Sequence, residues 1–184
     1  MALGRRPRLG DRPLAREGPA HPYVKLWRPY SRYPTKLVIL EPFGHGAISH
    51  WNGERSVPHH RRTRKCPGCK AQLPRLWYYY LSCLLLPQVE RVILQLSECG
   101  FGSCPELSRA EGKLRGRVIQ VARLKEGRRA AQVASMLPDL YTGAMLPPHQ
   151  TPLALCTLWG LTPDEVLGII ERDESVDLDN LPGE

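Results

Sequence analysis

Short apolar runs separated by turn-forming residues dominate the middle of the chain. The first run, residues 36–41, is rich in branched side chains. Two more runs, residues 76–83 and 89–96, contain the aromatic and β-branched side chains that strands favour. Residues 114–124 alternate basic and apolar side chains, and Gly127 turns the chain into residues 130–136, which predicts a hairpin. The pattern therefore predicts five strands.

Two segments carry helix signals. Ser103 and Pro105 predict the start of a short helix that ends at Gly112. Thr162 is a suitable N-cap for a second helix over residues 163–172, which has an apolar face. Five strands with a short helix between the third and fourth is the element order of the OB fold, a five-stranded Greek-key barrel. We therefore expect a mainly β, OB-like barrel with short helices; a mixed α+β sandwich is the alternative.

Composition divides the chain into four parts. Residues 1–22 are mostly Arg, Pro and Gly without apolar periodicity, so we expect a flexible basic arm. Residues 23–136 contain the predicted strands, and the stretch 44–75 within them has few core-forming residues, which predicts a long loop. Residues 137–172 then form a linker and the C-terminal helix, and residues 173–184 an acidic tail.

Charge is distributed unevenly along the chain. The formal net charge is +8, but residues 163–184 contain eight acidic side chains and one basic side chain. The first 162 residues carry 25 basic and 10 acidic side chains, a net charge of +15. Such an excess attracts polyanions and releases their counterions. We therefore expect a nucleic-acid partner; a solvated basic surface is the alternative.

The six cysteines are expected to be reduced. The N-terminus lacks the apolar run of a secretory signal, which favours a cytoplasmic protein with free thiols. The longest apolar run, residues 76–86, is too short to span a bilayer, so no membrane segment is expected.

The strongest local motif is a C-x2-C pair, Cys66 and Cys69, separated by Pro67 and Gly68. A tight turn of this kind places two thiolates on one face of a tetrahedral metal ion. The alternatives are unrelated free cysteines, a redox dithiol and a catalytic zinc. A redox dithiol needs a helix after the motif, and a nearby proline at position 74 prevents a long one. A catalytic zinc needs a general base, and no glutamate lies near the motif.

Histidines upstream of this motif supply the other two ligands. His50 and His59 give the spacing H-x8-H-x6-C-x2-C, which predicts one structural zinc ion per chain bound by His50, His59, Cys66 and Cys69. His60 could replace His59, and His45 could replace His50. The sequence contains no recognisable acid/base pair, so we expect no catalytic residues and no enzyme.

Basic residues interleaved with aromatic ones predict a nucleic-acid surface. In the predicted strand, Trp77 and Tyr79 share one face and Tyr78 and Tyr80 the other. One face must enter the core, while the other can stack unpaired bases. The predicted contacts are Arg55, Arg61, Arg62, Arg64, Lys65, Lys70, Arg75, Trp77, Tyr79, Arg115, Arg117 and Arg123.

The chain loosely resembles single-stranded DNA-binding proteins of tailed phages that carry a zinc loop inserted in an OB fold. The residues that carry the resemblance are His50, Cys66, Pro67 and Cys69, followed by the aromatic run 77–80. That family usually has three cysteines and one histidine as ligands, whereas this chain offers two of each. The resemblance implies that the acidic tail recruits a partner protein or competes with nucleic acid for the basic groove.

The sequence therefore predicts a non-enzymatic protein that binds single-stranded DNA or RNA and uses zinc to stabilise its fold. The alternative function is a regulatory or adaptor subunit of a nucleoprotein complex, which would use the basic zinc domain to contact protein or RNA. For the acidic tail, a simple contribution to solubility is the alternative.

Overall fold

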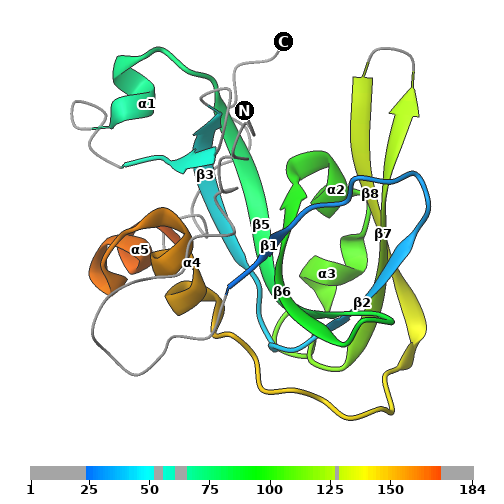
Figure 1. Cartoon of the computed structure of the whole chain (residues 1–184). Helices are drawn as coiled ribbons and strands as arrows, with labels where there is room; N and C mark the ends of the chain where they lie inside the picture. Colours follow the sequence, from blue (N-terminus) through cyan, green and yellow to red (C-terminus); the bar gives the residue numbers. More distant parts are fainter. Residues whose placement is uncertain (1–23, 52–55, 61–65, 127–128, 171–184) are drawn as a thin grey trace, which may run out of the picture.

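The computed structural model describes residues 24–51, 56–60, 66–126 and 129–170 (Figure 1). The strands are β1 (Leu26–Trp27), β2 (Thr35–Ile39), β3 (His45–Trp51), β4 (Ser56–Pro58), β5 (Arg75–Leu85), β6 (Glu90–Ser97), β7 (Arg117–Glu126) and β8 (Arg129–Leu140). The helices are α1 (Pro67–Lys70), α2 (Glu98–Gly102), α3 (Pro105–Arg109), α4 (Thr151–Trp159) and α5 (Pro163–Ile170).

The strands form one mixed sheet in the order β1-β6-β5-β2-β7-β8, and β3 pairs with β4 and β5. β1 runs parallel to β6, and the remaining pairs are antiparallel. β5 is the central strand, because β6 pairs with one of its edges while β2 and β3 share the other. Within the described residues β6 and β8 are not paired, so the barrel is not closed.

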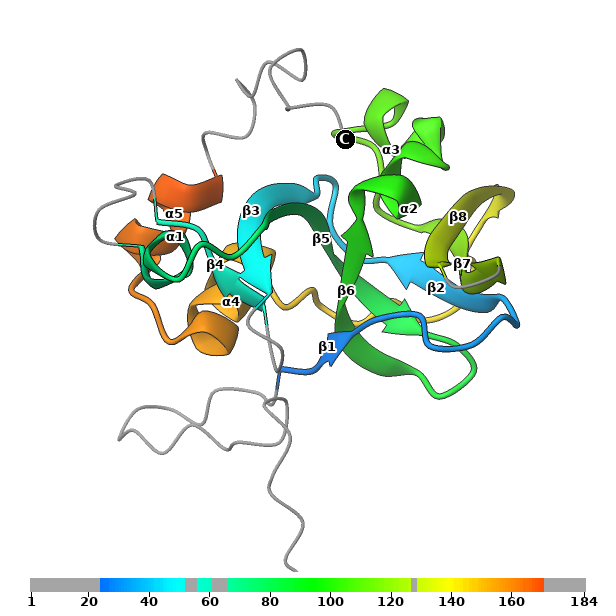
Figure 2. The ribbon, with the colours of Figure 1, turned by 90° about the horizontal axis from the view of Figure 1, so that it is seen from above.

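The curved sheet encloses the main hydrophobic core. Side chains from β2, β5, β6 and β7 meet there, together with Leu107 of α3 and Leu114. A second cluster lies on the opposite face of β5 and β6, where Tyr80 and Ile93 pack against Leu155 of α4 and Val166 of α5. Figure 2 shows the consequence, with α4 and α5 beside β3 and α2 and α3 on the other side of the sheet.

A break between β2 and β3 fixes the position of the C-terminal helices. Glu41 in this break is only 8% exposed, and its carboxylate accepts hydrogen bonds from the Thr151 backbone N–H, at 2.8 Å, and from the Thr151 hydroxyl. Thr151 is the first residue of α4, where backbone N–H groups lack partners within the helix. A buried carboxylate therefore anchors α4 to the sheet.

α5 begins as the sequence predicts. Glu165 accepts hydrogen bonds from both the backbone and the hydroxyl of Thr162, and the Glu165 N–H bonds the same hydroxyl, which is a capping box. No single described helix is long and apolar enough to cross a membrane. α4 and α5 pass that test only as a pair bent by 112°.

The mainly β class with short helices is confirmed. The five predicted strands correspond to β2, β5, β6, β7 and β8, and the two predicted helices to α3 and α5. The prediction that residues 44–75 form only a loop is wrong, because β3, β4 and α1 lie within them. The predicted linker 137–172 likewise contains the end of β8 and all of α4. The predicted arm 1–22 and tail 173–184 lie outside the described residues.

Replacing Glu41 with Gln should destabilise the fold. The amide keeps the shape but can no longer accept both bonds from Thr151, so a buried donor loses its partner, at a cost of about 1–3 kcal/mol in the free energy of unfolding. Urea denaturation followed by circular dichroism measures this loss. Asp139→Asn, at an exposed position on β8, is the control and should leave the midpoint unchanged. Equal midpoints for both variants would contradict the anchoring role.

Candidate metal centre and basic groove

Four potential metal ligands converge at one end of β3 and β5. His50 lies on β3, His59 directly follows β4, and Cys66 and Cys69 flank the start of α1. Their ligand atoms all lie within 4.8 Å of one another, so this cluster can hold a metal ion. Figure 1 shows α1 beyond the ends of β3 and β5.

The C-x2-C segment forms a single helical turn that aims both sulfur atoms inward. The Lys70 N–H bonds the Cys66 carbonyl at 3.0 Å, and Pro67 occupies the first helical position, where a missing N–H costs nothing. Gly68 is required because a Cβ there would lie 2.3 Å from the His50 ring. Close packing of this turn on β3 therefore brings the thiols to the imidazole.

The distances between the ligand atoms suit a single ion. The Cys69 sulfur lies 3.6 Å from His50 Nε2 and 3.4 Å from His59 Nδ1, and the Cys66 sulfur lies 3.6 Å from His59 Nδ1. The two ring nitrogens are 2.9 Å apart, which is also hydrogen-bonding distance, so a bound ion would replace this contact. The three nitrogen–sulfur distances are thus close to those between two ligands on one metal.

Hydrogen bonds orient the buried histidine. His50 Nδ1 lies 3.0 Å from the Leu73 carbonyl and 3.2 Å from the Pro74 carbonyl, so this nitrogen carries the proton. The tautomer leaves the Nε2 lone pair directed at the cluster. A metal-binding imidazole is usually held by a backbone carbonyl in this way.

The surroundings lower the pKa of two of the ligands, His59 and Cys66. Burial lowers the pKa of His59 to about 4, and the nearby charge of Arg75 contributes, so the imidazole is neutral at pH 7. Burial alone would raise the pKa of Cys66, but hydrogen bonds from the backbone at Cys69, His60 and Gly68 outweigh it and lower the pKa. A neutral imidazole and a thiolate are the protonation states that bind metal.

The structure separates the alternative histidines from the cluster. His45 lies at the opposite end of β3 from His50, and His60 is not among the grouped ligands. The remaining cysteines also lie elsewhere: Cys83 and Cys104 are buried, Cys99 is exposed on α2, and Cys156 is half-buried on α4.

A groove with basic and aromatic walls lies beside the end of β3 that carries the metal cluster. Its cavity is about 380 Å³ in volume, and it is lined by Arg28, Pro29, Trp51, Tyr78, Ser97, Arg123 and Gln132. The Arg28 guanidinium lies 5.7 Å from the centre of the Trp51 ring, which is cation–π distance. Trp51 is 38% exposed, so its ring is accessible from solvent. We call this cavity the basic groove.

Among the predicted nucleic-acid contacts within the described residues, only Arg123 lines the basic groove. Lys70 and Arg75 are exposed next to the metal cluster, and the Arg75 guanidinium lies 3.7 Å from the Cys69 sulfur. Arg115 and Arg117 lie near the opposite end of β7 from Arg123. The predicted contacts Arg55, Arg61, Arg62, Arg64 and Lys65 lie outside the described residues.

The prediction that Tyr79 contacts nucleic acid is wrong for the ring, because Tyr79 is 4% exposed and packs in the main core. Trp77 is half-buried and stacks on Tyr79, with ring centres 5.9 Å apart. Phe101 of α2 covers both rings. The Trp77/Tyr79 face of β5 is therefore the inner face of the sheet.

Sequence reasoning missed the rings of the basic groove. Alternation puts Tyr78 on the correct face of its strand, but nothing in the sequence indicates that this face is the partly open one. Trp51 adjoins the ligand His50 and ends a strand that the sequence does not predict. Arg28, in a segment rich in aromatic and basic residues just before the first predicted strand, was the missed signal.

Comparisons with known protein families, with curated proteins and with solved structures find no match for this chain. The resemblance to phage single-stranded DNA-binding proteins therefore remains a prediction from sequence.

The purified full chain should contain one metal ion. Cys66→Ser removes a donor from the cluster, so elemental analysis should show the metal content falling well below one per chain. Loss of the ion should lower the free energy of unfolding by about 2.7 kcal/mol when the free metal concentration is 100 times the dissociation constant. Cys99→Ser removes an exposed thiol outside the cluster and should keep the metal. Equal metal content in the two variants would contradict the site.

Proposed function

We propose that this protein binds single-stranded nucleic acid in the basic groove, without catalysis, and that a zinc ion stabilises the loop beside it. The observation that carries the proposal is the composition of the groove, in which two guanidinium groups and two aromatic rings line one cavity. Positive charge meets phosphates, and aromatic rings stack unpaired bases of any sequence. The proposal does not distinguish DNA from RNA.

The topology supports this position for a nucleic-acid site. If β2 and β3 are counted as one interrupted first strand, then β5, β6, β7 and β8 follow in OB order, with α2 and α3 between the third and fourth strands. OB folds are partly open barrels that bind oligonucleotides on the face of strands 2 and 3, between two loops. Tyr78 of β5 and Ser97 of β6 line the basic groove at the corresponding position.

A side-chain bond bridges the gap where a barrel would close. The Ser97 N–H of β6 bonds the Gln132 side-chain oxygen of β8 at 2.6 Å, although the two strands do not pair. Both residues line the basic groove. The open seam of the OB-like barrel would thus form the floor of the binding site.

Zinc is the metal that the donor set favours. Two thiolates and two imidazoles are soft or borderline ligands and suit a tetrahedral ion without redox chemistry. With Zn–S and Zn–N bonds of about 2.3 and 2.05 Å, a tetrahedral ion separates nitrogen from sulfur by about 3.6 Å. The observed nitrogen–sulfur distances of 3.4–3.6 Å agree with this value. Four protein ligands leave no open position, as in structural sites.

Exposed tyrosines extend the proposed path away from the groove. Tyr30 is 81% and Tyr33 68% exposed, and the Arg32 guanidinium lies 5.3 Å from the centre of the Tyr33 ring. Their loop is held beside β7, because the Arg123 N–H bonds the Ser31 carbonyl at 2.8 Å. A single-stranded nucleic acid that leaves the basic groove past Arg123 would meet the Tyr30 and Tyr33 rings next.

An adaptor role in a nucleoprotein complex is the second candidate, and a separate groove described below favours it. Binding of a bare oligonucleotide distinguishes the two functions, since an adaptor needs no affinity for nucleic acid alone. A cytoplasmic location remains part of the first proposal.

Truncation of the exposed ring should weaken nucleic-acid binding. Trp51→Ala removes a stacking surface worth about 1–3 kcal/mol, which predicts a loss of roughly 5- to 150-fold in affinity for a single-stranded oligonucleotide measured by fluorescence anisotropy. Phe43→Ala removes a ring of similar exposure outside the basic groove and should leave the affinity unchanged. An equal effect of both substitutions would argue against the groove.

Salt dependence tests the charge at the same site. Arg123→Ala removes one cation that would neutralise a phosphate, so the slope of log affinity against log salt should flatten by about 0.7, the value per neutralised phosphate on a single strand. Arg109→Ala, at an exposed position of α3, is the control and should leave the slope unchanged. If neither variant nor the wild-type chain binds an oligonucleotide at low salt, the nucleic-acid proposal fails and the adaptor function takes its place.

The acidic tail should oppose binding. Ending the chain at Arg172 removes five carboxylates that compete with phosphate for basic side chains, so the oligonucleotide should bind more tightly at low salt. The gain should vanish at high salt, where charges are screened. Equal affinity with and without the tail at low salt would show that the tail does not compete, and would leave the recruitment of a partner protein as its role.

A further inference from the structure

A second groove follows the edge of β3 at the end opposite Trp51. Two adjoining cavities of about 420 and 360 Å³ share Gly44, His45 and Glu111. The aromatic residues Trp77, Tyr79 and Phe101 line one side of the second cavity, and Pro152, Leu167 and Ile170 also border it. We call the two cavities together the edge groove.

The strand that borders the edge groove has an unpaired edge. β4 pairs with β3 only at residues 49–51, and no other described strand pairs with residues 45–47 on the edge away from β5. The Ile48 carbonyl accepts the His59 N–H across this edge, so the backbone groups of Gly46, two residues earlier, face the same way. Backbone groups on an open edge can accept an added strand.

Aromatic rings of β5 pack against one face of the glycines at this edge. A Cβ at Gly46 would lie 2.9 Å from the Trp77 ring, and one at Gly44 would overlap the Tyr79 ring. The Trp77 and Tyr79 rings thus occupy the space that side chains at positions 46 and 44 would otherwise fill. An incoming peptide would meet the backbone and the rings together.

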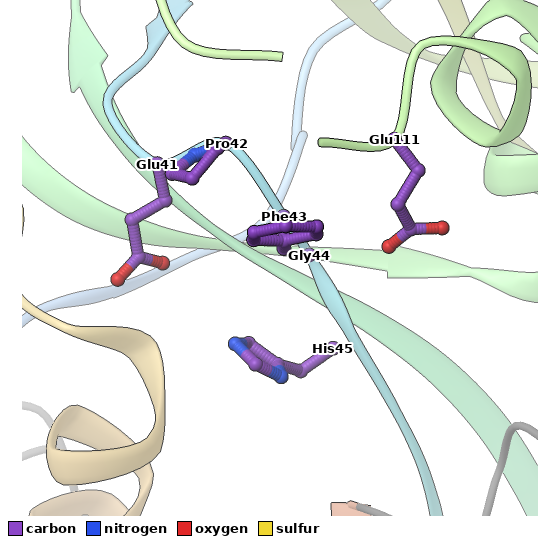
Figure 3. Close-up of a pocket in the computed structure, with 6 residues that line it drawn as sticks. All are labelled: Glu41, Pro42, Phe43, Gly44, His45 and Glu111. Atoms are coloured by element: carbon purple, nitrogen blue, oxygen red, sulfur yellow. The ribbon is translucent and has the colours of Figure 1, made fainter. Parts of the chain in front are cut away.

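Two carboxylates line the edge groove: Glu41, which is buried against Thr151, and Glu111, which is exposed. Figure 3 shows the carboxylates of Glu41 and Glu111 on either side of the Phe43 ring, with the His45 imidazole below it. Phe43 is 53% exposed and Glu111 is exposed, so both are accessible. Burial lowers the pKa of His45, so its ring is neutral at pH 7 and does not offset the carboxylates.

We propose that the edge groove binds an extended, arginine-bearing segment of a partner protein, which adds as a short strand to β3. Its backbone would pair with Gly46, and its alternate side chains would enter the space beside Trp77 and Leu167. The arginine would place its planar guanidinium against the Phe43 ring and donate to the Glu111 carboxylate. This surface is separate from the proposed nucleic-acid site.

Charge and the need for backbone hydrogen bonds argue against nucleic acid, the acidic tail and the basic arm as occupants of the edge groove. The exposed Glu111 carboxylate would repel phosphates and the acidic tail. The chain's own basic arm is a poor strand, because Arg6 and Arg12 each precede a proline, which has no N–H to donate. A segment from another protein can carry positive charge and need not have a proline after its arginine.

A designed peptide tests the proposal on the full chain. The probe is a blocked pentapeptide of alternating threonine and valine with a central arginine, and binding is followed through the backbone amide signals of Gly44 and Gly46 in NMR spectra. Replacing the arginine by neutral citrulline, or methylating a central backbone nitrogen, should each abolish most of the binding. Glu111→Gln should weaken it about tenfold, the loss expected for a charged hydrogen bond. Glu98→Gln, an exposed glutamate outside the groove, should bind like the wild-type chain.

Three results would overturn the proposal. The first is equal binding by the Glu111→Gln variant or by the citrulline peptide. The second is a several-fold gain in affinity when Arg5, Arg6 and Arg8 are changed to Ser, since that would make the arm the resident occupant. The third is movement of the same glycine signals on addition of an oligonucleotide, which would make the groove part of the nucleic-acid path. Loss of oligonucleotide binding alone would leave this proposal intact.

Discussion

One edge of β5 is shared by two strands, and the rest of the structure depends on this arrangement. β2 pairs with residues 83–85 of β5, and β3 pairs with residues 75–80 on the same edge. The chain must therefore leave the sheet after β2 and return before β3. The break directs the Glu41 carboxylate to α4 and leaves Phe43 and His45 beside an open strand edge. β3 then carries the chain to the end of β5 where the metal ligands meet.

Alternation along β3 couples the metal cluster to the basic groove. Neighbouring residues of a strand point to opposite faces, so His50 turns toward α1 while Trp51 turns toward Tyr78. A shift of one residue in the pairing of β3 with β5 would exchange the two faces. An ion that holds the buried His50 therefore also holds the register that presents Trp51 at the groove.

The metal cluster was the most predictable part of the molecule, because ligand chemistry depends on residue type and close spacing. The four ligands lie within twenty residues of the sequence: His50, His59, Cys66 and Cys69. They could therefore be grouped without knowing which distant strands pair. Most strands were also predictable, since their branched and aromatic runs are distinct. The sequence could not decide between His59 and His60, because adjacent residues differ only in the direction of their side chains.

β3 and α4 were not predictable for opposite reasons. β3 contains Gly46 where a strand normally has a side chain, since the Trp77 ring from β5 occupies that space. Its sequence therefore shows no apolar alternation. α4 is apolar on nearly all sides and so lacks the helical periodicity of a surface helix. Without α4, the sequence could not show that Tyr80 is covered, or which face of β5 enters the core.

The two ends of β3 carry surfaces of opposite charge without mutual interference. Trp51 lies six positions after His45, which corresponds to about 20 Å along an extended strand. The Debye length at physiological ionic strength is about 8 Å, so exposed charges at this separation are largely screened from each other. Glu111 at the edge groove would therefore have little effect on a phosphate bound near Arg28 and Arg123. A polyanion and a basic peptide could occupy the same small domain at the same time.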